Sequence, residues 1–511
     1  MARNEQVNDP STPSLAHRKM SPRWHLLNTV LGGTEAMREA GSQYLPKHHN
    51  EPYDVYEERL ERSVFTNVTE LTLDFLVGKP FAKQVSLNED VPDRLREFSE
   101  DIDLQGNDLH RFCQLWFREA LHKGFAHVLI DTPAMSEGMT LDDQRRMNLR
   151  PYWVQISPDN LIAAEAQRVR GHEMITHVRF FERDTVFNGF EEVEVLFIVS
   201  YDLVDLVGIG DPEDFRVQRT RYQYAKGKKG TYGEWEIETG PELTGLKEIN
   251  LVTFYANREG FMECKPPLLD LAYLNVAHWQ SESDQRSILT VSRFPILAAS
   301  GVSEYDQQSS TVIGPHGLLQ LDDPAARFYY VEHSGAAIEA GRKDLQDLEA
   351  RMAMYGAQLL TKRPDRETAS ARILDEASVV SPLQRMTYGF MDAVATALYF
   401  TARLTGLEEG GTVTVNTDFG LSADEIVDLQ TLVTMRKDRE ISHTAFIGEL
   451  KRRGVLHEKF DITEDVRLLK SEAEDFPTDQ ERKEAASGGD PEKTPIKGGG
   501  SENTPNTGDV E

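Results

Sequence analysis

The sequence predicts an α+β fold that carries a pair of long helices, and three observations support this prediction. Helical patterns come first and strand patterns follow over residues 26–265, as in an α+β unit with a largely antiparallel sheet. Two long helical stretches, 266–292 and 334–360, then enclose a short segment of strand-like runs. A last helical region precedes a tail, 471–511, with almost no apolar residues. The length of 511 residues leaves room for about two to four folded units.

The first part of the chain begins with a polar segment, residues 1–25, that contains three prolines and that we expect to be a loose arm. Apolar spacing predicts a helix over 24–38, a helical stretch over 52–78 that ends at Gly78, and helices over 91–98 and 108–122. Apolar runs predict strands over 126–131, 152–156, 177–183, 192–203, 215–224 and 235–237. Residues 26–265 are therefore expected to form one unit.

The two long helices are predicted from their apolar patterns. Pro266 and Pro267 suit the first turn of the helix over 266–292. The helix over 334–360 is roughly 40 Å long at about 1.5 Å per residue. Its apolar positions repeat at heptad spacing, which indicates a seam that faces another helix. These positions are Ile338, Leu345, Leu348, Met352, Tyr355 and Leu359. Short strand-like runs, separated by glycine and proline, fill residues 293–333 between the helices.

A single helical hairpin with a small β tip cannot cover all of this apolar surface, whereas copies packed side by side would cover it. The pattern therefore suggests a chain that is one segment of a ring-shaped assembly.

The remaining residues predict a third helix and a smaller helical region. A polar loop over 361–378 leads to Ser381 and Pro382, an N-cap followed by proline at the first helical position, and predicts a helix over 379–406. A short strand and capped helices at Ser422 and Ser442 follow within 407–470. The tail, 471–511, is rich in Glu, Asp, Gly and Pro and is predicted to be disordered.

The composition narrows the functional classes. The net charge of −29 is explained most simply by solubility, and it argues against broad nucleic-acid binding, which needs a basic surface. A protein through which DNA slides would also need to repel the duplex, and composition alone does not choose between these interpretations. No run of eighteen apolar residues predicts a transmembrane helix, and the N-terminus lacks the apolar core of a secretory signal. Cys113 and Cys264 have no metal-ligand spacing and are expected to be reduced structural residues.

The motifs that could indicate an enzyme each lack a residue, a spacing or a secondary structure that the chemistry requires. His172 and His177 are one residue too far apart for a zinc-protease helix, and their segment has the pattern of a strand. Gly208 and Gly210 are followed by Glu213 where a dinucleotide loop needs glycine. His127 and Asp131 share a strand face but lack a nucleophile. We therefore expect no catalytic, cofactor or metal site.

Several segments, taken in order, resemble the portal proteins of tailed double-stranded-DNA bacteriophages. They are Tyr44-Leu45-Pro46-Lys47; Arg59-Leu60-Glu61-Arg62-Ser63 continuing to Leu76-Val77-Gly78-Lys79-Pro80-Phe81; Pro266-Pro267-Leu268-Leu269-Asp270-Leu271-Ala272-Tyr273-Leu274-Asn275 through His278 to Asp284; Asp418-Phe419; and Ile441-Ser442 with Phe446 and Leu450. The resemblance covers roughly residues 43–470. The order of these segments is more specific than any one of them, since none carries chemistry.

The resemblance implies a ring, usually of twelve subunits, at one vertex of a capsid. Its parts would be a wing (26–265), a stem (266–292 and 334–360), a clip (293–333), a tunnel loop (361–378), a wing helix (379–406) and a crown-like region (407–470). A terminase motor docked on the clip would drive double-stranded DNA through the ring, and the DNA would leave by the same route at infection. The implied partners are the terminase large subunit, the major capsid and scaffolding proteins and a head–tail adaptor, with no membrane. The implied location is the virion, and the host cytoplasm during assembly.

The tunnel loop gives the sharpest local hypothesis. Its basic residues, Lys362, Arg363, Arg366 and Arg372, would touch phosphates without reading bases. Asp365 and Glu367 would keep that contact weak. A solvated charged connector is the simpler interpretation of the same residues. Two other functions stay open for the whole chain: a cytosolic α+β hydrolase with a helical insertion, and another kind of ring-forming capsid connector.

Overall fold

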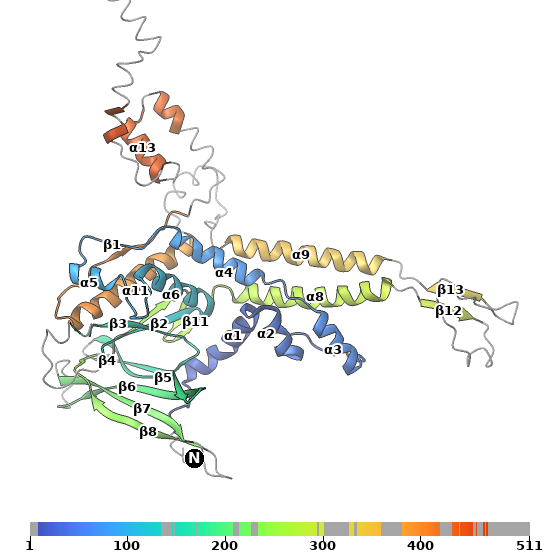
Figure 1. Cartoon of the computed structure of the whole chain (residues 1–511). Coiled ribbons are helices and arrows are strands. Elements are labelled where there is room, and N and C mark those ends of the chain that lie inside the picture. Colours follow the sequence, from blue (N-terminus) through green and yellow to red (C-terminus); the bar gives the residue numbers. More distant parts are fainter. Residues whose placement is uncertain are drawn as a thin grey trace, which may run out of the picture. The chain divides into compact units, whose positions relative to one another are not determined.

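The computed structural model of the chain describes residues 9–133, 146, 149–169, 171–207, 214–225, 233–293, 296–300, 327–331, 335–358, 381–419, 432–438, 440–452, 456, 463–465 and 467–468. The chain divides into two compact units, Met1–Phe419 and Gly420–Glu511. The first unit mixes helices and sheets, in agreement with the predicted α+β class (Figure 1).

Helix α1 (Leu15–Leu31) begins inside the segment predicted to be a loose arm, so that prediction is wrong from Ser14 onwards. The Ser14 side chain accepts a hydrogen bond from the His17 N–H at 3.1 Å and caps the helix. Pro22 lies inside α1 and removes one backbone hydrogen bond. The burial of Met20 and Trp24, which are 1% and 3% exposed, offsets this cost. Helix α2 (Gly33–Ala40) and the short helix η1 (Gly41–Gln43) follow.

The helical stretch predicted over 52–78 is two helices, α3 (Tyr53–Arg62) and α4 (Val68–Gly78). Ser63 is extended and ends α3. Asn67 caps α4 by accepting a hydrogen bond from the Glu70 N–H at 3.1 Å. A local cap therefore interrupts an apolar period that otherwise runs on through both helices. The short helix η2 (Pro80–Ala82) follows α4.

Two antiparallel sheets replace the single sheet that the sequence predicted. A three-stranded sheet has the order β3-β2-β9, and a five-stranded sheet has the order β4-β5-β6-β7-β8. The strands are β2 (Phe125–Asp131), β3 (Tyr152–Ile156), β4 (Leu161–Val169), β5 (His172–Asn188), β6 (Glu191–Asp205), β7 (Phe215–Ala225), β8 (Glu234–Leu243) and β9 (Leu251–Tyr255). Strand β4 was not predicted, because its Ala, Glu and Gln residues favour helices over strands. A small ribbon of β10 (Arg258–Gly260) and β11 (Glu263–Cys264) follows β9.

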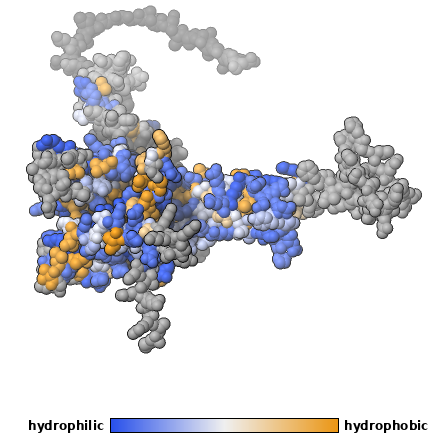
Figure 2. Space-filling view, turned by 60° about the horizontal axis from the view of Figure 1, so that its bottom comes forward, coloured by the Kyte–Doolittle hydropathy of each residue, from blue (hydrophilic) through white to orange (hydrophobic). Residues whose placement is uncertain are grey.

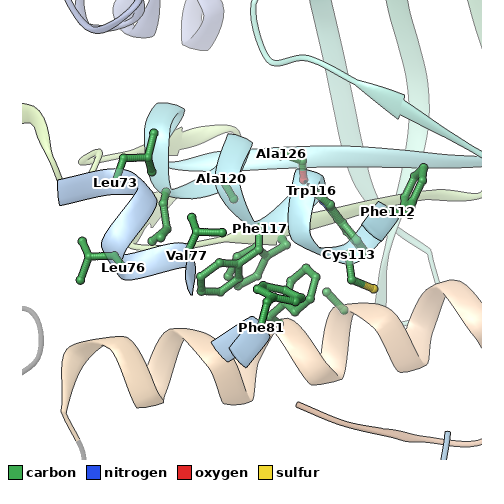
Figure 3. Close-up of a cluster of buried hydrophobic side chains, with 14 of the residues drawn as sticks. Leu73, Leu76, Val77, Phe81, Phe112, Cys113, Trp116, Phe117, Ala120 and Ala126 are labelled. Atoms are coloured by element: carbon green, nitrogen blue, oxygen red, sulfur yellow. Dashed lines mark hydrogen bonds between the residues drawn. The ribbon is translucent and has the colours of Figure 1, made fainter. Parts of the chain in front are cut away.

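Aromatic side chains from α6 (Leu109–Lys123), β9 and α11 (Pro382–Leu404) form the centre of the main core. The Phe390 ring lies 5.2 Å from the Phe117 ring and 5.0 Å from the Phe254 ring, between ring centroids. Figure 3 shows Phe117, Phe81 and Trp116 of this cluster beside Leu73, Leu76 and Val77 of α4. Helix α5 (Asp93–Phe98) adds Leu95 and Phe98 to the same core. This core gives the long helices a rigid base.

The two long helices are α8 (Leu269–Arg293) and α9 (Ala336–Gln358), close to the predicted bounds. They lie side by side (Figure 1). Between them in the chain, β12 (Ile296–Ser300) pairs antiparallel with β13 (Arg327–Val331). The strand-like runs predicted at 311–313 and 318–321 lie outside the described residues.

The predicted third helix is α11, and Ser381 and Gln384 form a reciprocal capping box at its start. Strand β14 (Val413–Thr414) pairs with β1 (Ser86–Leu87), and Val413, Val415 and Phe419 are buried in the main core. The C-terminal region predicted from residue 407 therefore begins only after Phe419, because residues 407–419 pack with the first unit.

In the second unit, α13 (His443–Arg452) is capped by Ser442, whose hydroxyl accepts a hydrogen bond from the Ala445 N–H at 3.1 Å. Residues 432–437 are helical, which agrees with the end of the helix predicted from Ser422. The start of that helix and the tail 471–511 lie outside the described residues. None of the helices in the described ranges is both long and apolar enough to cross a bilayer.

Candidate assembly surface around the long helices

Buried polar contacts fix the base of α8 against α4. The Asn275 side chain is fully buried. Its Oδ1 accepts hydrogen bonds from the Thr69 N–H at 3.1 Å and the Thr69 hydroxyl at 3.0 Å, and its Nδ2 donates to the Thr66 carbonyl at 2.8 Å. Because Asn275 satisfies groups at the start of α4 that no helical bond can satisfy, it sets the rotation of α8 at this point.

A second buried contact links α3 to α8 about two turns further along, where the Arg59 guanidinium of α3 donates to the Ser283 hydroxyl of α8 at 3.4 Å. Arg59 and Glu51 form a bidentate ion pair with nitrogen–oxygen distances of 2.8 and 2.9 Å. Their side chains are only 5% and 7% exposed. The Arg59 guanidinium also donates to the Pro46 carbonyl at 3.0 Å and lies 3.6 Å from the Asp284 carboxylate. Hydrogen bonding from Arg59 lowers the pKa of the Glu51 carboxyl, so the pair is charged at neutral pH.

Two more contacts complete the attachment of α8 to the N-terminal segments. The Ser63 hydroxyl donates to the Ser283 hydroxyl at 2.8 Å. The Gln280 side chain donates to the Tyr44 carbonyl at 2.6 Å. The segments at 44–47, 59–63 and 266–284, which carried the sequence resemblance, therefore meet in one place around α8.

The predicted seam of α9 is only partly an apolar seam. Leu348 and Met352 are 8% and 1% exposed and face the body of the unit. Ile338 and Leu345 are half-buried, while Tyr355 is 38% exposed. Leu359 lies outside the described residues.

Polar contacts hold the outer part of the α8–α9 pair together. The Ser281 hydroxyl donates to the Asp344 carboxylate at 2.6 Å, and the Gln285 amide donates to the Ile338 carbonyl at 2.9 Å. Gly341 lets the helices approach closely here, since a Cβ at this position would stand 2.0 Å from the Gln285 side-chain oxygen. Sequence periodicity alone did not indicate these contacts.

Large apolar side chains remain uncovered near the base of the long helices. Leu71 and Phe75 of α4 are 69% and 51% exposed, Tyr273 of α8 is 60% exposed and Met354 of α9 is 61% exposed. The N-terminal part of α4 and the C-terminal part of α9 touch here, with Thr72 against Gly356. Figure 2 shows the hydrophobic areas of this face mainly on the body of the first unit, while the projecting helices are mostly hydrophilic. Exposed apolar clusters of this kind mark interaction surfaces.

His127 and His177, which belong to the candidate enzyme motifs, both have polar partners in the structure. His127 is fully buried, and its Nδ1 lies 2.9 Å from the Thr253 hydroxyl. Burial lowers the pKa of His127 to about 3 and raises the pKa of the Cys264 thiol to about 12. His172 and His177 lie on strand β5, and His177 Nδ1 is 2.6 Å from the Asp202 carboxylate. Within the described residues, no three His, Cys, Asp or Glu side chains are placed to hold a metal ion.

The tunnel-loop residues Lys362, Arg363, Arg366 and Arg372 lie outside the described residues. DNA contact by these residues therefore stays a prediction. The polar residues that anchor α8, above all Asn275 and Arg59, were not singled out from the sequence. Asn275 is a polar residue within the apolar start of α8, which is its one sequence signal, whereas Arg59 lies among the charged residues of α3 and has none.

Comparison with known proteins finds a match to a family without an assigned function, and it finds solved structures that are only remotely similar to this chain. A family described as a domain of unknown function (DUF4055) matches residues 267–405, which include α8, α9 and α11 and make up less than half of the chain. No curated protein matches the chain.

Solved structures with some similarity come from gene transfer agent (GTA) particles. A chain of the virion of the native GTA particle is 10% identical, with a TM-score of 0.36, over 74% of this chain and 88% of that chain. A chain from the neck of the empty particle, computed with C6 symmetry, is 10% identical with a TM-score of 0.36 over 76% of this chain and 89% of that chain. A chain from the neck of the native particle, computed with C12 symmetry, is 10% identical with a TM-score of 0.35 over 75% and 89% of the two chains. Scores of this size do not by themselves show a shared fold.

Proposed function

We propose that the chain is a portal protein, which assembles as a ring around a channel for double-stranded DNA at one vertex of a capsid. The observation that carries this proposal is the pair α8–α9, which is anchored by buried polar contacts with the segments that resemble portal proteins. A small antiparallel β pair, β12–β13, connects the two helices. This order of stem, clip and stem is the order that the resemblance implies.

The exposed surface of α9 supports packing between copies. Only Leu348 and Met352 of this helix are buried, and its half-buried residues follow the same stripe toward α8. On the opposite face, small and apolar residues stand at spacings of four and three, but Lys343 and Asp347 interrupt them. The small and apolar residues are Ala336, Ala340, Ala350, Met354 and Ala357, all exposed. The last part of this outer face, Ala350, Met354 and Ala357, is small and apolar, and a neighbouring copy would provide a partner for it.

The proposed channel passes DNA without gripping it. The chain carries a net charge of −29, so a ring of copies would repel the phosphate backbone over most of its surface. The four basic residues of the tunnel loop would make weak, sequence-independent phosphate contacts. The clip, 293–333, would receive the terminase motor, and the ring would contact capsid, scaffolding and head–tail adaptor proteins in the virion.

Two other functions predict different behaviour. An α+β hydrolase with a helical insertion would be a monomer or small oligomer and would lose activity when one residue of a polar pocket is replaced. Another type of ring-forming capsid connector would share the ring but not the order of stem, clip and stem.

Size-exclusion chromatography with light scattering, followed by negative-stain imaging, tests the proposal. A large closed ring with a central opening is expected. A uniform monomer, at concentrations up to those used for imaging, would contradict the proposed function. The variant Met354→Asp, which places a charge on the face of α9 that points away from α8, should weaken the ring. The control variant Lys343→Asp, on the same face, would change charge without removing an apolar contact and should weaken it less.

A further inference from the structure

The strongest unassigned feature of the first unit is an open slot between β9, the start of β5 and one face of α11. The slot has a volume of about 570 Å³. All five residues of β9, Leu251 to Tyr255, line it. Since alternate residues of a strand point to opposite faces, a run of five consecutive lining residues means that the edge of β9, and not one of its faces, borders the slot.

The register of the three-stranded sheet shows which backbone groups of β9 face this edge. Among the strands that the structure describes, β9 pairs with β2 alone. The Ile130 N–H donates to the Asn250 carbonyl, and the Ala256 N–H donates to the Gly124 carbonyl. In an antiparallel ladder the bonded pairs alternate. The backbone groups of Val252 and Phe254 therefore bond to β2, and those of Thr253 and Tyr255 point into the slot.

The start of β5 supplies a second open edge. Glu173 to Ile175 also line the slot, and on one side they pair with β4. On their other side, pairing with β6 begins only at His177, which lies opposite Asp202. Two strand edges that have no neighbouring strand among the described residues thus face the same slot. Unpaired strand edges are where an extended segment adds by main-chain hydrogen bonds.

The side chains of the slot favour a segment that is partly apolar and carries a basic residue. Met174, Ile175 and Phe400 provide apolar lining. Glu173 and Asp392 are exposed, and neither forms an ion pair with another described residue. The third acid at the slot, Glu248, is already paired with Arg403. Arg258 also lines the slot and offsets one of these two carboxylates, so a net negative charge remains for a cation on the incoming segment.

We propose that residues 1–8 of this chain occupy the slot as an added strand beside β9. The carbonyls of Pro10 and Thr12 accept hydrogen bonds from the Arg179 side chain at 3.0 and 3.1 Å, so the chain just after this segment lies against β5. Arg179 is four residues along β5 from Ile175, which corresponds to about 13 Å. Eight extended residues span up to about 26–29 Å, so the segment reaches the slot. About four of these residues cover the distance to the slot, which leaves Met1 to Asn4 beside β9; Arg3 supplies the cation, and Met1 an apolar side chain.

Residue-resolved amide hydrogen exchange on the full chain tests the proposal. The N–H groups of Thr253 and Tyr255 should be protected in the full chain and should exchange roughly tenfold faster or more when residues 2–8 are deleted. The N–H groups of Val252 and Phe254, which bond to β2, should not change. Arg3→Glu, which leaves the length intact, should give a smaller increase at the same two residues. Equal exchange of Thr253 and Tyr255 in the full and shortened chains would overturn the proposal.

A disulfide cross-link identifies the occupant independently. Arg3→Cys combined with Thr396→Cys, an exposed residue of α11 that lines the slot, should form a bond within one chain. The native Cys113 and Cys264 are fully buried and do not compete. The single variant Arg3→Cys is the control. A disulfide between two chains would assign the slot to a second copy of the chain. If no disulfide forms, residues 1–8 do not occupy the slot. Either result contradicts the proposal. Because the slot belongs to one chain, this test is separate from ring formation.

Discussion

Removal of the Glu51 carboxylate is the sharpest test of how the long helices are anchored. Glu51→Gln keeps the size of the side chain but leaves the Arg59 guanidinium, which is 5% exposed, without its bidentate partner. The remaining carboxylate near it, Asp284, is 3.6 Å away and 47% exposed, so it compensates only in part. Breaking a buried ion pair by removing one partner costs about 3–5 kcal/mol of stability. We expect Glu51→Gln to lower the free energy of unfolding by about this amount.

The matched control lies on the neighbouring helix. Glu58 and Arg62 also form an ion pair, but their side chains are 60% and 52% exposed. Exposed pairs contribute at most about 1 kcal/mol. Urea unfolding of the two variants at pH 7, followed by circular dichroism, should therefore show a large shift for Glu51→Gln and a small one for Glu58→Gln. The double variant Glu51→Leu, Arg59→Met should be more stable than Glu51→Gln, because it buries no unpaired charge. Equal effects of Glu51→Gln and Glu58→Gln would refute the proposed anchoring.

Three further predictions follow from the described contacts and from the loop sequence. Asn275→Leu should lower the free energy of unfolding by about 3 kcal/mol, since Thr69 and Thr66 lose hydrogen bonds in a buried site. The exposed control Asn257→Leu should change the free energy of unfolding by less than about 1 kcal/mol. Similar losses in both variants would contradict the role of Asn275. Burial holds the pKa of His127 near 3, below its value in the unfolded chain. As the pH falls from 7 to 5, His127 therefore gains a proton in the unfolded chain but not in the folded chain, and this lowers the free energy of unfolding. His127→Gln should therefore reduce the acid-induced loss of stability over this range by about 2 kcal/mol, measured by urea unfolding at both pH values, and an unchanged pH dependence would show that His127 is not held neutral. Replacement of Lys362, Arg363, Arg366 and Arg372 by Ser should impair DNA packaging or retention without affecting ring assembly, and normal packaging in that variant would remove the hypothesis of DNA contact.

The sequence predicted the elements that depend on regular apolar spacing. Helices α8, α9 and α11 begin and end within a few residues of the predicted limits, because each has a long apolar pattern and clear proline, serine or glycine signals at its ends. The capping box at Ser381 is an example in which one short motif fixes the start of a helix.

Elements that depend on tertiary contacts were harder to predict. Helix α1 contains Pro22, and only the burial of Met20 and Trp24 against the sheets makes a helix favourable there. Strand β4 has a helix-favouring composition and is a strand because β5 pairs with it. The division into two sheets depends on where strands pair, which the pattern of a single chain does not contain.

The sequence identified the segments that form the candidate site but not the side-chain contacts between them. The resemblance pointed to the segments around Tyr44, Arg59 and Asn275, yet periodicity gave no reason to pair them. Buried polar contacts join residues more than 200 positions apart, as between Thr69 and Asn275, and no local signal encodes such a pairing. The seam of α9 shows the converse: heptad spacing predicted an apolar contact along its length, whereas its outer part pairs with α8 through Ser281 and Gln285.

An electron cryo-microscopy reconstruction of the purified full chain tests the portal hypothesis most directly. The hypothesis predicts a closed ring in which α8 and α9 of neighbouring copies pack side by side around an axial opening wide enough for B-form DNA. A particle in which α8 and α9 contact no other copy, or an assembly with no axial opening, would contradict it.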